Sequence, residues 1–256
     1  MASNNVLPSI SIGWWRVEVS MLEINNFSKS YRKDRKAVDC LSLKVDKGDI
    51  FGFIGHNGAG KTTTLRAIAG ILDFDEGDIL VDGISVKKDA VACKKLMAYI
   101  PDNPDLYEHL TGIKYLDFIS DIYEVTKSDR ESLIRKYSDE FELTSNLGDT
   151  IASYSHGMKQ KLAIIGALVH KPKLLILDEP FVGLDPKAAH TVKAIMVELC
   201  QEGSAVFFST HVLEVAEKLC NKIAIIKGGK LMAYGPIDKV KGDQSLEEVF
   251  LDLINK

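Results

Sequence analysis

The feature that most constrains the fold is a glycine-rich motif of the form G-x-x-x-x-G-K-[ST]. The apolar residues 48–54 before the motif predict a buried strand, and residues 63–69 after it predict the first turns of a helix. This order of strand, loop and helix is typical of a loop that binds a nucleoside triphosphate, and it argues against a chance glycine-rich turn. The motif consists of Gly55, His56, Asn57, Gly58, Ala59, Gly60, Lys61 and Thr62.

The residue types of this loop suit a chain of phosphates. Small residues let successive backbone N–H groups point at an anion, and the following helix adds its unpaired N-terminal N–H groups. We expect Lys61 to contact the β- and γ-phosphates, and the Thr62 hydroxyl to bind Mg²⁺, which prefers oxygen ligands. The loop alone indicates only a nucleoside triphosphate, because kinases, GTPases, motors and transporters all use it.

Two other apolar strands end in polar residues that fit such a site. Residues 173–177 lead to Asp178 and Glu179, and buried acids are costly unless they are paired or hold a metal. We expect Asp178 to act on Mg²⁺, directly or through its water, and Glu179 to polarise an attacking water. Residues 205–210 lead to His211, a candidate contact for the γ-phosphate, although a single histidine is more often structural.

Composition limits the partners and the compartment. The net charge of −4 offers no basic field for nucleic acid, so we expect no nucleic-acid partner. The four cysteines are scattered, without a C-x-x-C pair, and are interpreted as reduced thiols of a cytosolic protein. No apolar run reaches the roughly 18–20 residues that cross a bilayer, so a membrane role would be that of a peripheral subunit.

The pattern along the chain predicts one domain with an insertion. Residues 1–20, including Trp14 and Trp15, are interpreted as an extension that is non-native or disordered, rather than as a membrane or partner anchor. Residues 21–256 are expected to form a single α/β domain. Apolar residues at helical spacing, with no strand-like segment, predict a helical subdomain inserted at about 104–157. Strands are expected over 22–45, with a turn at 33–35.

A second helix start, at residues 154–158, would by itself be only a capped helix. Together with the other motifs, its sequence Y-S-H-G-M resembles the L-S-G-G-Q signature of the ATP-binding-cassette (ABC) transporter family, which other phosphate-loop proteins lack. The resemblance covers about residues 21–250, and the variant Y-S-x-G-M-x-Q resembles the exporter-like branch. The motifs in the family's order and spacing are Asp178-Glu179-Pro180, Gly183-Leu184-Asp185 and Thr210-His211.

The resemblance implies a fold and an activity. The fold would be a phosphate-loop (RecA-like) α/β core with an antiparallel β subdomain and an inserted α-helical subdomain. The activity would be hydrolysis of ATP with Mg²⁺, with ATP held by residues 55–63, Thr63 included. Tyr31 would stack on adenine, although alone it is better explained as an ordinary strand aromatic. Catalysis would use Glu179 and His211, and the metal ligands would be Thr62, Asp102 and Asp178.

The resemblance also implies an assembly. Ser155, His156, Gly157 and Met158 would contact the ATP of a second nucleotide-binding subunit, and Asp185 would lie in the dimer loop. The expected unit is a head-to-tail homodimer that ATP closes and hydrolysis opens. This motion would drive a separate membrane subunit, for export by the resemblance to the exporter-like branch, so the chain would be cytoplasmic and peripheral on the inner face of the membrane.

Three residues depart from the family pattern. His56 stands where proline is more common, and His156 replaces the first glycine of the signature. Asp102 stands where the family has a glutamine between the core and the helical insert. An aspartate can still bind the metal, but the departure puts in doubt the usual relay of motion to the membrane subunit. Residues 104–112 lie where membrane subunits dock in the family; the candidate contacts are Asp105, Leu106, Tyr107 and Glu108.

Two other functions stay open at this point. One is a soluble ABC ATPase that acts in translation or DNA repair. The insert is too short for the long coiled coils of repair-type members. Ribosome-type members usually carry two cassettes, and this chain has one. A catalytically silent regulatory cassette is the other, and it conflicts with the presence of Lys61, Asp178, Glu179 and His211.

Overall fold

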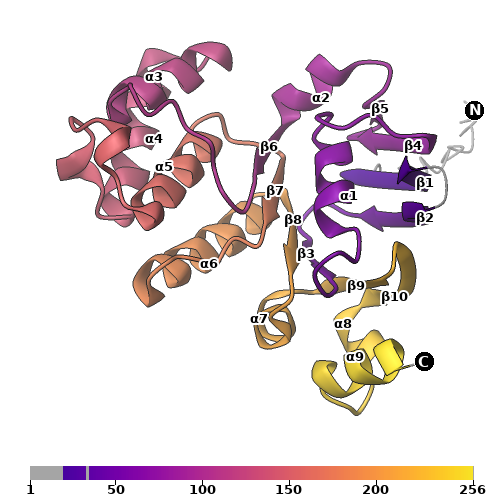
Figure 1. Cartoon of the computed structure of the whole chain (residues 1–256). Helices are drawn as coiled ribbons and strands as arrows, with labels where there is room; N and C mark the ends of the chain where they lie inside the picture. The colour runs from indigo at the N-terminus through magenta and orange to yellow at the C-terminus, as the bar shows by residue number, and fades with distance from the viewer. Residues whose placement is uncertain (1–19, 33–34, 256) are drawn as a thin grey trace, which may run out of the picture.

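The computed structural model describes residues 20–32 and 35–255 (Figure 1). Residues 1–19, which make up most of the predicted extension and include Trp14 and Trp15, lie outside the described residues. So do residues 33–34 of the predicted turn. In chain order the elements are β1 (Leu22–Arg32), β2 (Arg35–Val45), β3 (Ile50–Ile54), α1 (Lys61–Ile68), β4 (Glu76–Val81), β5 (Ile84–Ser85), α2 (Ala90–Leu96), β6 (Met97–Ile100), α3 (Gly112–Ile122), α4 (Lys127–Glu140), the 3₁₀ turns η1 (Thr144–Asn146) and η2 (Ile151–Ser153), α5 (His156–Leu168), β7 (Leu174–Asp178), α6 (Pro186–Gln201), β8 (Ala205–Thr210), α7 (Leu213–Leu219), β9 (Lys222–Lys227), β10 (Lys230–Pro236), α8 (Ile237–Lys241) and α9 (Leu246–Asn255).

A six-stranded sheet forms the centre of the molecule, in the order β10-β9-β3-β8-β7-β6. All neighbouring strands are parallel except β10 and β9, which form an antiparallel hairpin at one edge. Strands β3, β7 and β8 are buried over their whole length, which explains why they are continuous apolar runs. The α/β core expected from the sequence is therefore confirmed.

Alternate residues of these strands enter two hydrophobic cores. Phe53 and Phe207 pack on one face of the sheet together with Leu65 of α1. Ile54 and Phe208 pack on the other face, where α5, α6 and α7 supply apolar residues. Figure 1 shows α1 and α6 on opposite sides of the central strands. The period of two along a strand thus divides the interior into two layers.

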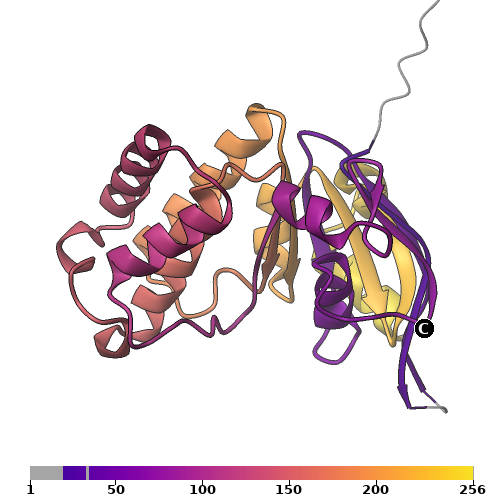
Figure 2. The same cartoon turned by 90° about the horizontal axis from the view of Figure 1, so that it is seen from above.

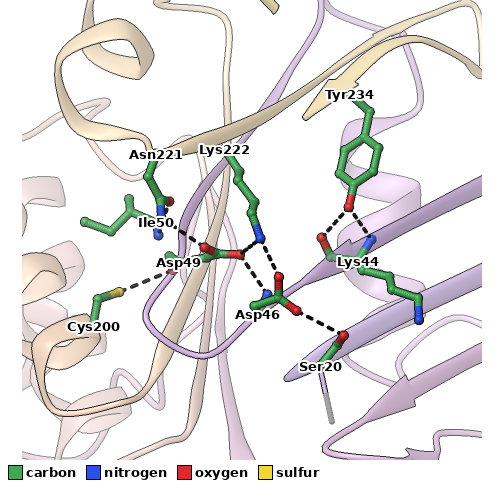
Figure 3. Close-up of polar contacts among 9 residues, drawn as sticks. All are labelled: Ser20, Lys44, Asp46, Asp49, Ile50, Cys200, Asn221, Lys222 and Tyr234. Atoms are coloured by element: carbon green, nitrogen blue, oxygen red, sulfur yellow. Dashed lines mark hydrogen bonds and ion pairs between the residues drawn. The ribbon is translucent and has the colours of Figure 1, made fainter. Parts of the chain in front are cut away.

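A second sheet, in the order β2-β1-β4-β5, is antiparallel throughout and covers the α1 side of the core. Figure 2 shows it as the outer layer, beyond α1. The expected antiparallel β subdomain is confirmed. Tyr234 of β10 joins the two sheets, because its hydroxyl accepts a hydrogen bond from the Lys44 N–H at 3.1 Å and donates one to the Lys44 carbonyl at 2.9 Å (Figure 3).

A buried carboxylate at the start of β3 fixes the same junction (Figure 3). Asp49 is nearly inaccessible and accepts hydrogen bonds from the Asp46 N–H at 2.7 Å and the Asn221 side chain at 2.9 Å. The Lys222 ammonium lies 2.8 Å from Asp49 and 2.5 Å from Asp46. The loop after β2 and the start of β9 are therefore held together by charge-assisted hydrogen bonds, which are the stronger kind.

The helices α3, α4 and α5 form a separate group beside the core (Figure 1). Each begins at a hydroxyl that caps its first turn: Thr111, Thr126 and Ser155 accept hydrogen bonds from backbone N–H groups of their own helices. Helix α5 packs on α3 and α4 and also on β6, so it joins this group to the central sheet. Where the inserted subdomain begins and ends, at about 104–157, stays a prediction.

Two further observations concern the whole described chain. Across residues 20–32 and 35–255, none of the helices has the length and apolar character needed to cross a membrane. The four cysteines are free thiols, and Cys93, Cys200 and Cys220 are buried.

Candidate functional site

A cavity of about 640 Å³ lies at the C-terminal ends of β3 and β7. Residues from the β1–β2 hairpin, the glycine-rich loop, α1, the loop after β6 and the end of β7 line it. The cavity brings together most of the residues that the sequence singled out: Tyr31, His56, Asn57, Gly58, Gly60, Lys61, Thr62, Thr63, Asp102, Asp178 and Glu179. The remaining predicted nucleotide contacts, Gly55 and Ala59, are buried residues of the loop and do not line the cavity.

The glycine-rich loop needs glycine at Gly60 in particular. Its φ of 111° is disfavoured for other residues, and a Cβ atom there would lie 2.6 Å from the Ala37 carbonyl oxygen. Helix α1 begins at the next residue, Lys61, so its first N–H groups open toward the cavity. A helix start of this kind binds phosphate through its unpaired N–H groups and its positive dipole end.

Lys61 is buried and reaches across the end of the sheet. Its ammonium donates to the Gly55 carbonyl at 2.6 Å and lies 3.3 Å from Glu179 Oε1. The loop lysine and the acid after β7 are therefore in direct contact in the wall of the cavity. A cation held at this point by the backbone is placed to bind a phosphate oxygen.

Glu179 has a strained backbone and a second partner. Its φ is 48°, a conformation uncommon for a residue with a side chain. Its N–H donates to Ser209 Oγ at 3.1 Å, and its Oε2 lies 3.0 Å from Nδ1 of His211. Strain of this kind is often found at functional sites. His211 does not itself line the cavity; it contacts Glu179 from the end of β8.

Asp178 is buried, and one of its oxygens has no partner. Oδ1 accepts a hydrogen bond from Ser209 Oγ at 2.5 Å, whereas Oδ2 has no hydrogen-bond partner among the described residues. A cation at Oδ2 would offset that cost. Thr62 and Asp102 line the same cavity, so the oxygen ligands that Mg²⁺ prefers are present.

The described residues contain no group of three or more His, Cys, Asp or Glu side chains arranged to hold a metal. A Mg²⁺ site of the nucleotide type needs fewer protein ligands, because Mg²⁺ there takes one or two protein oxygens and completes its ligand set with phosphates and water. The donor set of Thr62 and Asp178 therefore fits Mg²⁺ bound together with a phosphate chain.

The rim of the cavity contains Tyr31, which was predicted from the sequence, and several residues that were not. Tyr31 is largely exposed there, with its hydroxyl 3.3 Å from Thr63 Oγ1. Beside it lie Arg32 and Arg35, which pair opposite each other in the β1–β2 register. The signal available in the sequence was a basic run directly after Tyr31. The missed cavity residues are Arg32, Arg35, Lys36, Ala37 and Gly228.

The predicted signature residues 155–158 do not line this cavity. They form the start of α5, where the Ser155 hydroxyl accepts a hydrogen bond from the Met158 N–H at 3.3 Å. His156 and Gly157 lie against Gly183, since a Cβ atom at Gly183 would be 2.6 Å from the His156 ring. Within one subunit, this helix start and the phosphate loop are therefore separate features.

Asp185 caps α6 next to this helix start. Its Oδ1 accepts a hydrogen bond from the Ala188 N–H at 2.8 Å, and its Oδ2 lies 2.9 Å from the Lys161 ammonium. These two interactions, in that order, lower the pKa of Asp185. The end of the loop that follows Glu179, at Asp185, is therefore held to α5 by the ion pair with Lys161.

Comparison with known proteins agrees with this geometry. The family model described as ABC transporter matches residues 38–182. The chain is 38% identical over 90% of its length to the uncharacterized ABC transporter ATP-binding protein YhcH of Bacillus subtilis, covering 73% of that protein. It is 35% identical over 84% of its length to the linearmycin resistance ATP-binding protein LnrL of the same organism, covering 69%.

A solved structure also matches. It is the ATP-binding subunit of an ABC transporter, with a TM-score of 0.88 and 33% sequence identity, and the match covers 91% of this chain and 99% of that one. The similarity therefore extends over both sheets and the helical group, and not over the phosphate loop alone.

Proposed function

Because the chain belongs to the ABC transporter family as a subunit that binds and hydrolyses ATP, we propose that it powers an exporter as a Mg²⁺-dependent, head-to-tail dimer. The observation that carries the proposal is the cavity in which Lys61 of the phosphate loop meets Asp178 and Glu179 at the end of β7. Phosphate binding and water activation are thereby available at one place.

The roles follow from the contacts. Lys61 and the N–H groups at the start of α1 bind the phosphate chain. Thr62 and Asp178 would hold Mg²⁺, which would supply charge neutralisation of the phosphates. Glu179 orients and polarises the attacking water, and His211 holds the Glu179 carboxylate in place through its 3.0 Å contact. Tyr31 offers its ring to the base at the open rim.

The dimer explains the signature residues. Ser155 and Gly157 lie outside the cavity of their own subunit, at the start of a 13-residue helix whose N–H groups suit an anion. In a head-to-tail dimer this helix start completes the partner's site by binding the γ-phosphate. ATP then favours the closed dimer, because it contacts both subunits in that state.

A membrane subunit is proposed to dock near α3. Tyr107, Phe118 and Ile122 are exposed apolar residues there, and Tyr107 and Phe118 pack edge to face with ring centroids 5.5 Å apart. Exposed aromatic pairs are typical of contact surfaces for another protein. Asp102 lines the cavity and precedes Tyr107 by five residues in the chain, so it suits a link between docking and hydrolysis.

Export is the direction that the relatives favour. LnrL is a linearmycin resistance protein, and removal of a compound from the cell is a direct route to resistance. In this proposal the chain lies in the cytoplasm, on the inner face of the membrane, attached through its membrane subunit.

The test has two parts. First, the purified protein is assayed for Mg²⁺-dependent release of phosphate from ATP. Second, the tagged protein is purified from detergent-solubilised membranes of its own organism, and co-purifying chains are identified by mass spectrometry. A polytopic membrane protein in stoichiometric amount is expected. Recovery with ribosomal or DNA-repair proteins instead would contradict the transport role while leaving the ATPase intact.

A further inference from the structure

Gln160 is a fully buried polar residue of α5 for which the proposed mechanism has no role. Its side chain is 0% exposed, and neither Oε1 nor Nε2 has a hydrogen-bond partner among the described residues. Burying polar groups without partners costs free energy of folding. An apolar side chain of similar volume would not carry this cost. The residue is therefore poorly suited to a purely structural role.

Helical spacing shows which way Gln160 faces. His156 and Gly157 both lie against Gly183, in the segment that joins β7 to α6. Gln160 follows them by four and three residues, so it is on the same side of α5, one turn further along. Helical geometry therefore places Gln160 on the side of α5 that packs against this segment.

The segment that joins β7 to α6 has backbone groups that a side-chain amide can hydrogen bond. Glu179 and Gly183 both have positive φ angles, of 48° and 79°. The Val182 N–H donates to the Glu179 carbonyl at 3.2 Å. Within residues 180–184, the backbone N–H groups that donate to no described residue are those of Phe181, Gly183 and Leu184.

We propose that Gln160 is a positioning residue for ATP hydrolysis. Its carboxamide hydrogen bonds to the backbone of residues 180–184 when Glu179 and Asp185 take up their working positions. A carboxamide suits this task because it donates through Nε2 and accepts through Oε1. The proposal rests on the proposed function, which gives Glu179 its catalytic role, and it connects the signature helix α5 directly to the segment that carries this acid.

The experiment compares Gln160→Leu and Gln160→Met with the wild-type protein, using steady-state ATP hydrolysis and thermal unfolding. Both substitutions keep a similar volume and remove the buried polar atoms. We expect the Tm to stay equal or rise, because an unpaired polar group is lost. We expect kcat to fall roughly ten- to hundredfold, because the acid is less well placed. The KM for ATP should be unchanged, since Gln160 does not line the cavity.

The matched control is Leu162→Met. Leu162 is equally buried on the same helix, and the change conserves volume, so Tm and kcat should stay near wild type. A parallel fall of Tm and kcat in both Gln160 variants would overturn the proposal in favour of a structural role, and so would a wild-type kcat. An inactive wild-type protein would overturn the proposed function as well, whereas active wild-type and active variants would overturn this inference alone.

Discussion

The Glu179 carboxylate lies 3.3 Å from the Lys61 ammonium, and this contact joins the end of β7 to the start of α1. The Lys61 side chain is 6% exposed and that of Glu179 15%, so salt screens the pair only weakly. A phosphate chain bound to Lys61 therefore competes with Glu179 for the same cation. This relationship makes the two residues the first targets for substitution.

Glu179→Gln should abolish turnover while ATP binding persists. The amide cannot accept a proton from water, and general-base catalysis contributes about 10²–10⁴-fold. Phosphate release should fall by at least the lower of these factors. Gel filtration with ATP should detect an ATP-bound dimer that does not hydrolyse its nucleotide. Glu202→Gln, an exposed change at the end of α6, serves as the control and should match wild type. Hydrolysis at the wild-type rate would remove Glu179 from the mechanism.

Lys61→Ala should weaken ATP binding itself. A hydrogen bond to a charged group contributes about 1.5–3 kcal/mol, which corresponds to roughly 10- to 150-fold in Kd. Titration with a fluorescent ATP analogue measures this directly. Lys88→Ala, at an exposed position away from the cavity, should leave the Kd unchanged. Equal affinity of the Lys61 variant and wild type would place the phosphates elsewhere.

Asp178→Asn should raise the Mg²⁺ concentration needed for half-maximal hydrolysis. The asparagine keeps an oxygen that can accept the Ser209 hydrogen bond, but the charge that attracts the metal is lost. A shift of roughly tenfold or more is expected, in line with the loss of a charged interaction of at least about 1.4 kcal/mol. Mg²⁺ titrations at saturating ATP measure the shift. An unchanged Mg²⁺ dependence would exclude Asp178 from the metal site.

His170 should make stability depend on pH. Its ring stacks on Tyr123 with centroids 3.7 Å apart, and the Nε2–H donates to the Met97 carbonyl at 3.3 Å. Burial lowers the pKa of His170 to about 4, against the opposing effect of the Met97 hydrogen bond. In the unfolded chain the pKa of this histidine is about 6.5, so between about pH 4 and pH 6.5 the unfolded state binds more protons than the folded state. Stability should be lost as pH falls from about 6.5 toward 4, by up to about 1.4 kcal/mol per pH unit.

The measurement for His170 is urea unfolding at several pH values. His170→Phe keeps an aromatic ring against Tyr123 and removes the titrating group, so its stability should depend less on pH over the same range. Above about pH 7 the free energies of unfolding of the two proteins should change with pH in nearly the same way. Equal slopes for the variant and wild type below pH 6.5 would show that His170 is not the group responsible.

Asp49→Asn should lower the free energy of unfolding by about 1.5–3 kcal/mol. The substitution removes the charge that the Lys222 ammonium contacts at 2.8 Å and disturbs the hydrogen bonds from Asp46 and Asn221. Chemical denaturation gives the value. Asp243→Asn, an exposed change, should be within about 0.5 kcal/mol of wild type. Equal stability of the Asp49 variant would mean that the junction in Figure 3 contributes little.

Much of the site could be predicted from local sequence. The phosphate loop is recognisable because its function requires small residues and a lysine at fixed positions before a helix. Asp178 and Glu179 were recognisable because two acids directly after an apolar strand are unusual. The predicted strands over 22–45 form β1 and β2, up to the two residues outside the described chain. Helices α7 and α8 were not predicted, because each is short, with seven and five residues, and offers only one or two turns of apolar spacing.

Local sequence is sufficient to indicate most of the strands, helices and motifs in their order, because spacing and turn residues act over a few positions. Which of these elements lie together is set by tertiary packing. The Lys61–Glu179 contact, the place of Arg32 and Arg35 at the cavity rim, and the complete burial of Gln160 all depend on segments far apart in the chain. Periodicity identifies the buried face of an element, but the partner of that face is set by packing, and packing is a property of the whole chain.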